Sequence, residues 1–221
     1  MNLIALETST RRLSVALWHD RELAERSADA PNGGSGLLLP WVRELLAEAE
    51  LALSQLDGIA FGAGPGSFTG LRLAAGCAQG LAFGANLPVL GVGSLQALAL
   101  ASGEEKVFAC VDARMNEVYV AAYANGIEVL APAVLPPERV RLPEGDGWVG
   151  CGDGFAAYGA LLPHPSLVLP QVFPTAAAVA RLARSRFECG EGRPAAEAIP
   201  IYVRDKVALT TAERLARGGV R

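Results

Sequence analysis

Residues 2–27 read NLIALETSTRRLSVALWHDRELAERS, and this stretch decides the first part of the fold. Three short segments of strand character, residues 2–7, 13–18 and 22–27, are joined by the tight polar connections TSTRR and HDR. Short strands at this spacing are typical of an antiparallel meander. We therefore expect the chain to open with three consecutive paired strands.

After the meander, the sequence alternates between helical and strand patterns. The predicted elements are a helix over residues 37–51, a strand over 57–63, a helix over 68–83, a strand over 88–92 and a helix over 94–101. Ser35 is the expected N-cap of the first of these helices. Strands that alternate with helices after a meander indicate a mixed sheet with parallel crossover connections.

A polar break at residues 102–106, SGEEK, is followed by a second half that also begins with strands. Its predicted elements are a hairpin of strands over 107–113 and 117–125, a third strand at GIEVLAP (126–132), the segment WVGCGDG (148–154), a helix from Phe155, a strand over 166–169 and a helix over 175–189. We interpret the chain as an α/β protein with two lobes of related plan, residues 1–103 and residues 104–221.

Composition limits the classes of function. The 221 residues carry 19 Lys and Arg against 23 Asp and Glu, a net charge of −4, so bulk charge alone does not hold nucleic acid. The four cysteines form no C-x-x-C pair and the two histidines, His19 and His164, are isolated, so we expect no metal site and no cofactor. The longest apolar stretch, residues 87–101, is too short and too interrupted for a membrane span. With no signal peptide pattern at its start, the chain is expected to be cytoplasmic, without a membrane partner.

Glu7, Thr8, Ser9 and Thr10 occupy the turn between the first two predicted strands. Hydroxyl groups and backbone N–H groups in such a turn can face a phosphate, and Glu7 could hold the Mg²⁺ that a phosphotransferase needs. An ordinary polar turn explains the same residues. We treat the four as a candidate vestigial phosphate loop.

A glycine-rich stretch, GAGPGSFTGLR (62–72), leads from a predicted strand into a predicted helix. It lacks the Lys-Ser or Lys-Thr pair of a P-loop, so we expect a structural loop in which Ser67 caps the helix. Further along the helix, Gly76, Gly80 and Gly84 are spaced four apart and share one face. Each glycine costs about 1 kcal/mol relative to alanine in a helix. Close packing on this face is therefore expected, either by the protein's own sheet and helices or by another chain.

Two further segments carry charge. Asp112 and Arg114 lie at the hairpin that opens the second half, where they could bind a phosphate or pair across the turn. The turn GCGDG (150–154) is by itself weak evidence for nucleotide binding. YVRDK (202–206) and the arginines beyond it make the C-terminal end mildly basic, which is more typical of a solvated surface than of an RNA-binding patch.

Together these motifs resemble one protein family. ALETST (5–10), the Leu-rich helix with its early proline, GPGSFTGLR (64–72), DARMNEVYVAAY (112–123) and YVRDKV (202–207) are similar to the TsaB (YeaZ) family of bacterial tRNA threonylcarbamoyladenosine biosynthesis proteins. The resemblance covers nearly the whole chain. It implies a two-lobed actin/hexokinase/Hsp70-like (ASKHA) fold, in which each lobe is a mixed sheet flanked by helices.

The resemblance also implies a function. TsaB-like proteins are non-catalytic subunits that bind and support the catalytic subunit TsaD, together with the ATPase TsaE. The complex transfers threonylcarbamoyl from threonylcarbamoyl-AMP to the adenosine 3′ of the anticodon in tRNAs reading ANN codons. For this chain the resemblance implies no catalysis of its own, a homodimer when alone, and contact with tRNA only through the complex.

In this family the first two helices of the N-terminal lobe form the dimer interface. The partner-binding residues that the resemblance implies are Leu38, Trp41, Val42, Leu45, Phe68, Leu71, Arg72, Gly76 and Gly80. One stretch departs from the family pattern: residues 31–40 read PNGGSGLLLP, without the histidine and the acidic or amide neighbour that are common there. Contacts that depend on those two side chains are not expected in this chain.

Two other functions stay open from the sequence. A small-molecule kinase or ATPase of the same fold would use Glu7 or Asp112 as its working carboxylate, with Mg-ATP between the lobes. A peptidase, suggested by the glycoprotease-like name of relatives, is the weakest of the three because the sequence shows neither metal ligands nor a catalytic triad.

Overall fold

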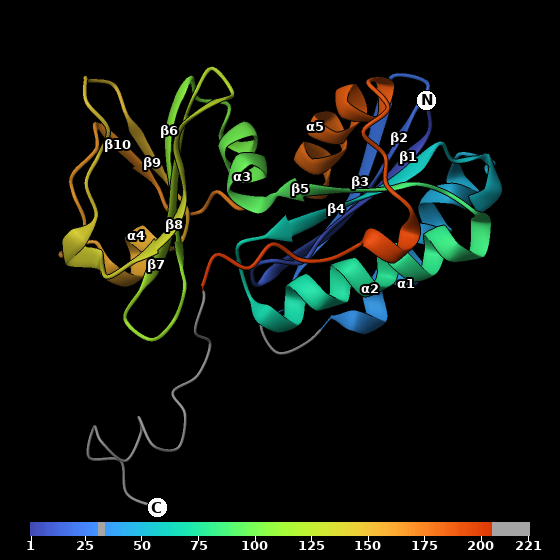
Figure 1. Ribbon diagram of the computed structural model, residues 1–221, viewed down its shortest axis with the longest axis horizontal. Coiled ribbons are helices and arrows are strands. Elements are labelled where there is room, and N and C mark those ends of the chain that lie inside the picture. The colour runs from blue at the N-terminus through green and yellow to red at the C-terminus, as the bar shows by residue number, and fades with distance from the viewer. Residues whose placement is uncertain (31–33, 205–221) are drawn as a thin grey trace, which may run out of the picture.

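The computed structural model describes residues 1–30 and 34–204 (Figure 1). Residues 31–33 of the stretch that departs from the family pattern lie outside the described residues. The same holds for residues 205–221, which include the predicted basic end with Arg214, Arg217 and Arg221.

The first lobe holds a five-stranded mixed sheet in the order β3-β2-β1-β4-β5. Its strands are β1 (Leu3–Glu7), β2 (Arg12–His19), β3 (Glu22–Asp29), β4 (Gly58–Gly64) and β5 (Val89–Gly93). The strands β1, β2 and β3 pair antiparallel as the predicted meander, whereas β4 pairs parallel with β1 and with β5. Helix α1 (Ser35–Glu48), with a short 3-10 turn at Leu53–Gln55, connects β3 to β4, and α2 (Phe68–Ala85) connects β4 to β5. Helix α3 (Ser94–Ser102) follows β5 and leads to the second lobe.

The second lobe repeats this plan in the order β10-β9-β6-β7-β8. Its strands are β6 (Lys106–Asp112), β7 (Val118–Ala124), β8 (Ile127–Leu135), β9 (Val149–Cys151) and β10 (Leu167–Leu169). Again three consecutive strands form an antiparallel meander, and two later strands add in parallel beside the first of them. The remaining elements are α4 (Gly154–Tyr158), α5 (Ala176–Glu188) and 3-10 turns at Pro137–Arg139 and Ala195–Glu197. Two sheets of matching topology confirm the predicted two-lobed α/β fold.

Helices cover both faces of the first sheet. In Figure 1, α1 and α2 lie below the sheet and α5 lies above it. The buried stripe of α2 is made of Leu71 and four alanines, which lets this helix lie close to the sheet. The α1 stripe is Leu38, Val42, Leu45 and Leu46. The α1 stripe and the four buried alanines of α2 form the main core of this lobe together with apolar side chains of β1, β2 and β4.

An N-cap residue was predicted for two helices, α1 and α2. Ser67 caps α2, since its Oγ accepts a hydrogen bond from the Gly70 N–H at 3.5 Å. The prediction for Ser35 is wrong, because Ser35 is already the first residue of α1 and Gly34 precedes it as the cap. Gly34 has a φ of 153°, which a residue with a side chain rarely adopts.

The end of the described chain returns to the first lobe. The alanine-rich face of α5 packs against β1, β2, β4 and β5. The backbone N–H of Ala176, at the start of α5, donates to the Ser14 Oγ on β2 at 2.7 Å. Residues 104–221 are therefore not one contiguous lobe, although the two sheets do divide near residue 103. Helix α5 covers the face of the first sheet that α1 and α2 do not cover.

Helix α3 lies between the lobes (Figure 1). Its Leu95 and Leu98 pack in the core of the second sheet, while Ala97 packs with α5 on the first. Over the described part of the chain, no helix is both long and apolar enough to cross a lipid bilayer.

Candidate functional site

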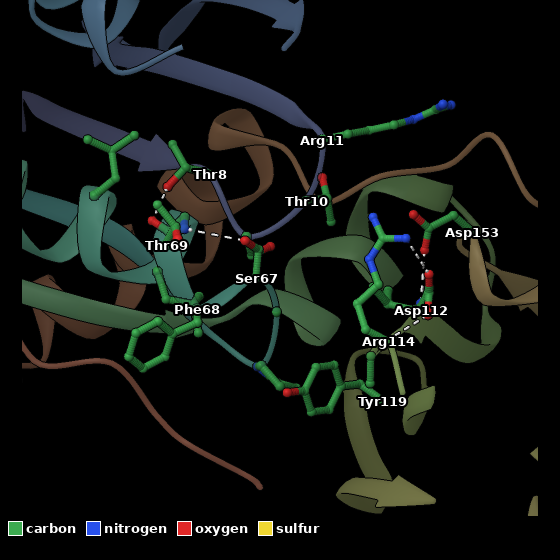
Figure 2. A pocket seen from close by; sticks show the side chains of 18 of the residues that line it. Thr8, Thr10, Arg11, Ser67, Phe68, Thr69, Asp112, Arg114, Tyr119 and Asp153 are labelled. Atoms are coloured by element: carbon green, nitrogen blue, oxygen red, sulfur yellow. Dashed lines mark hydrogen bonds and ion pairs between the residues drawn. The ribbon is translucent and has the colours of Figure 1, made fainter. Parts of the chain in front are cut away.

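A cleft of about 850 Å³ lies between the two lobes. Its first wall is the β1–β2 turn, residues 8–11, together with the loop and first turn of α2, residues 65–71. The opposite wall is the β6–β7 turn, residues 111–115, with Asp153 beside it, and residues 201–204 also line the space. Figure 2 shows the hydroxyl groups of Thr8, Thr10, Ser67 and Thr69 on one side and the charged side chains of Asp112, Arg114 and Asp153 on the other.

Glu7 does not face this cleft. Its carboxylate is fully buried, with Oε1 accepting from the Ser9 N–H at 2.6 Å and Oε2 accepting from the Ser94 hydroxyl at 3.1 Å. The Ser94 Oγ in turn accepts from the Gly64 N–H at 3.2 Å. Burial raises the pKa of the Glu7 carboxyl above its ordinary value. Glu7 thus joins three segments of the lobe interior and is not placed to hold an ion in the cleft.

Two other residues of the candidate phosphate loop, Thr8 and Ser9, pack against the glycine-rich loop. The Thr8 hydroxyl donates to the Gly70 carbonyl oxygen at 2.6 Å, and the Ser67 N–H donates to the Ser9 carbonyl oxygen at 2.7 Å. A Cβ at Gly66 or Gly70 would collide with the backbone of this turn. The glycines therefore allow two loops to lie against each other, which is the structural role predicted for them.

The charged wall is organised by Asp112. Its Oδ1 accepts from the Arg114 N–H at 2.8 Å and from the Tyr158 hydroxyl at 3.3 Å, and its Oδ2 lies 3.2 Å from Arg114 Nη1. Asp112 and Arg114 thus pair across the turn, one of the two roles predicted for them. The Asp112 N–H donates to Asp153 Oδ1 at 3.1 Å. Burial, followed by the neighbouring charge of Asp112, raises the pKa of Asp153.

Arg204 differs from the solvated surface that the sequence predicts. Its Nη2 donates to the Glu117 carboxylate at 2.6 Å and to the Ala113 carbonyl oxygen at 3.0 Å, and only 13% of its side chain is exposed. Just before it, the Ile201 N–H donates to the Ala63 carbonyl oxygen at 2.7 Å. Residues 201–204 thereby tie the first lobe to the β6–β7 turn. Sequence reasoning missed this contact because nothing in YVRDK specifies a distant partner.

The predicted partner-binding residues fall into two groups. Leu38, Val42 and Leu45 are buried in the core of the first lobe, and Leu71 is buried beside the cleft. The resemblance implied these residues as partner-binding, but other parts of this chain cover their side chains, so these four are removed from the partner-facing set. Trp41 is half-buried against the same core. Phe68, Arg72, Gly76 and Gly80 are exposed on α2.

The exposed face of α2 is open. A Cβ placed on Gly76, Gly80 or Gly84 would meet no heavy atom of the described residues within 4 Å. Packing by the described part of the chain therefore does not explain these glycines. Phe83, which the sequence analysis did not single out, lies beside them with 63% of its surface exposed. The sequence could have indicated Phe83, because it is a large apolar residue that does not belong to the sheet-facing stripe of α2.

Known proteins match this chain in sequence over most of its length. Residues 34–145 match the family model described as TsaD, tRNA N6-adenosine threonylcarbamoyltransferase. Over 223 aligned residues, the chain is 37% identical to the tRNA threonylcarbamoyladenosine biosynthesis protein TsaB of Escherichia coli, covering 94% of this chain and 96% of that one. The TsaB protein of Haemophilus influenzae is also 37% identical, with 94% and 95% covered. This chain belongs to the TsaB family.

Solved structures agree with membership of the TsaB family. YeaZ from Pseudomonas aeruginosa matches with a TM-score of 0.85 and 44% identity, covering 91% of this chain and 99% of YeaZ. A second Pseudomonas aeruginosa structure, described as an uncharacterized protein with similarity to peptidase YeaZ, matches with a TM-score of 0.86 and 43% identity, covering 92% and 99%. The resemblance stated from the sequence motifs is confirmed, and with it a part for the TsaB family in tRNA threonylcarbamoyladenosine biosynthesis.

Proposed function

We propose that this chain is a non-catalytic subunit of the complex that transfers threonylcarbamoyl from threonylcarbamoyl-AMP to the adenosine 3′ of the anticodon in tRNAs reading ANN codons. It acts by binding and supporting a TsaD-type catalytic subunit, with a TsaE-type ATPase as the third component. The observation that carries this proposal is the open glycine face of α2. Being a TsaB family member, the chain already has a place in the biosynthetic process.

The glycine face supports a protein partner for energetic reasons. Gly76 and Gly80, inside the helix, together cost about 2 kcal/mol relative to alanine, and the described residues place nothing against them or against Gly84. Phe68 and Phe83, with 44% and 63% of their surface exposed, flank the same face. A smooth face flanked by exposed aromatic rings suits close approach of another chain. The same face would serve for a homodimer when the chain is alone.

The cleft supports the non-catalytic part of the proposal. Glu7, the carboxylate of the candidate phosphate loop, is buried and held by Ser9 and Ser94. The first wall of the cleft therefore presents hydroxyl groups without the carboxylate that a Mg²⁺-dependent phosphotransferase would need there. We place the reaction on the TsaD-type partner, the protein in the cytoplasm, and tRNA in contact with the chain only through the complex.

Reconstitution tests this function. Purified chain, TsaD-type and TsaE-type partners, tRNA, threonylcarbamoyl-AMP and ATP are combined, and modified adenosine is measured over many turnovers. We expect sustained turnover only when the chain is present. Equal turnover without the chain would show that it is not a subunit of the complex.

A bulky substitution tests the surface. Gly76→Leu places a side chain in the open face without touching the described core, so the variant should fold normally but lose co-elution with the TsaD-type partner. Ser185→Leu, an exposed position on α5 across the sheet, is the matched control and should co-elute like the original chain. If Gly76→Leu still co-elutes, the partner binds elsewhere.

The opposite, charged wall of the cleft supports a second candidate function, a kinase or ATPase. Its volume of about 850 Å³ suits a small molecule, and Asp112 and Asp153 line it. Calorimetry of the isolated chain with Mg-ATP tests this function. Tight binding that Asp112→Asn abolishes would favour the enzyme, and absence of binding would leave the subunit role.

A further inference from the structure

Arg72 is the only charged residue in the 18 residues of α2. Phe68, Arg72, Gly76, Gly80 and Gly84 are spaced four apart and therefore form one oblique row, which turns by about 40° around the helix axis at each step. The row begins with an aromatic ring, continues with a guanidinium, and ends in three smooth positions that the described residues leave open. A single cation thus stands in an otherwise apolar exposed row.

The guanidinium of Arg72 contacts two aromatic side chains. Its Cζ lies 4.0 Å from the centroid of the Phe68 ring, and its Nε donates to the Tyr202 hydroxyl at 3.2 Å. The rings of Phe68 and Tyr202 are 5.9 Å apart, so both flank the same group. Among the described residues nothing pairs with the terminal nitrogens Nη1 and Nη2, and the residue is exposed. The two terminal nitrogens are therefore available to an anion at the N-terminal end of the exposed row.

A partner that covers this row removes Arg72 from water. A buried cation without an opposite charge is strongly unfavourable, so a stable interface over this row needs an anion at Arg72. A nucleic acid is disfavoured as its source, because the neighbouring positions of the row are glycine and phenylalanine and the chain carries a net charge of −4. A carboxylate on a protein surface fits both the charge and the apolar surroundings.

We propose that the partner of this face presents an Asp or Glu carboxylate to Arg72, as the charged anchor at the N-terminal end of the glycine row. This inference rests on the proposed function and adds the chemistry of the contact. The partner lays a helix or another smooth apolar segment along Gly76, Gly80 and Gly84, and its carboxylate accepts two hydrogen bonds from Nη1 and Nη2. Tyr202 is a positioning residue that holds the guanidinium through Nε.

The affinity of the full-length chain for its purified TsaD-type partner tests the proposal. Arg72→Ala should weaken binding by at least about 30-fold, Arg72→Glu by more, and Arg72→Lys by less than Arg72→Ala. Arg181→Glu makes the same charge reversal on the exposed side of α5 and should bind within about twofold of the original chain. Unchanged thermal unfolding of the Arg72 variants shows that each one folds.

Charge rescue then identifies the anchor. Reversing one acidic residue of the partner to arginine should restore binding to Arg72→Glu while weakening binding to the original chain. Tyr202→Phe keeps the ring but removes the acceptor, and should weaken binding about 2- to 10-fold. Such a loss should be absent when Tyr202→Phe is combined with Arg72→Ala, which a purely structural role of the hydroxyl does not predict.

The outcomes separate the inference from the proposed function. If the original chain does not bind the TsaD-type partner at all, the proposed function fails and this inference fails with it. If the original chain binds and Arg72→Glu binds equally well, only the inference is overturned. If Arg72→Glu instead loses affinity for isolated tRNA and keeps its affinity for the partner, the anion is a phosphate and the inference is likewise overturned.

Discussion

Glu7 joins the end of β1, the end of β4 and the start of α3 in the interior of the first lobe. Its carboxylate accepts from Ser9 and Ser94, and a Cβ at Gly62 would collide with it, so β4 must carry a glycine at that point. Burial raises the pKa of this group, which means that folding favours its protonated form.

The pH dependence of stability tests the role of Glu7. Because the folded pKa is raised, the folded state holds the proton more tightly than the unfolded chain does. The contribution of Glu7 to stability is therefore fully present below the unfolded pKa of about 4.5 and is lost as pH rises through the folded pKa. Glu7→Gln removes this group, so its thermal stability should fall less than that of the original chain as pH rises from 5 to 8. Parallel pH profiles of the two proteins would contradict this account.

At the scale of single residues, the sequence predicted which chemical groups are present better than it predicted their burial and their contacts. ETST shows hydroxyl groups suited to a phosphate, but which of its side chains face solvent depends on β4 and α3, far along the chain. The same limit applies to Leu38 and Leu71, which the family resemblance implied as partner-binding although both side chains are buried within this chain. Arg204 pairs with Glu117 across 87 positions, a contact that no local pattern reports.

Among the elements, α2 is the one that supports binding of a partner, because its two faces differ. One face, with Ala74, Ala78 and Ala82, packs on the sheet, and the opposite face holds the open glycines. The sequence predicted nearly all helices and strands because their periodicity is local. It did not predict that α5 returns to the first sheet, since a helix of small apolar residues fits either lobe.

Gly80→Ala tests whether the glycine face is kept for binding. Because a Cβ at this position meets no heavy atom of the described residues, the substitution should stabilise the monomer, measured at a concentration too low for a homodimer, by about 0.5–1 kcal/mol. The added methyl group should at the same time weaken binding of the TsaD-type partner. Ser185→Ala on α5 is the control, expected to raise stability slightly with no change in affinity. Higher stability of Gly80→Ala with full affinity would mean that the glycines do not contact the partner.

Across the whole molecule, two sheets of the same topology are joined by α3 and by residues 201–204 (Figure 1). The repeated plan was visible in the sequence because both halves begin with a strand meander. The connection through residues 201–204 was not visible in the sequence, because it depends on Arg204 contacting the β6–β7 turn. That turn holds Arg114, Met115 and Asn116 at positive φ, which side chains disfavour, so it needs support from its surroundings.

Arg204→Ala tests this support. The variant loses two hydrogen bonds to the β6–β7 turn and leaves the half-buried Glu117 carboxylate without its cation, so we expect stability to fall by about 1–3 kcal/mol. Hydrogen exchange of residues 112–117 should become faster than in the original chain. Arg139→Ala, at an exposed position in the second lobe, should change neither quantity. Unaltered exchange in the turn of Arg204→Ala would show that the two lobes do not depend on this contact.

Binding of a TsaD-type chain along the exposed face of α2 is best tested by hydrogen–deuterium exchange of the full-length protein with and without that chain. We predict that protection on complex formation centres on residues 68–85 and includes residues 199–204, whereas α5 exchanges as before. Protection confined to the second sheet, with α2 unaffected, would contradict the account.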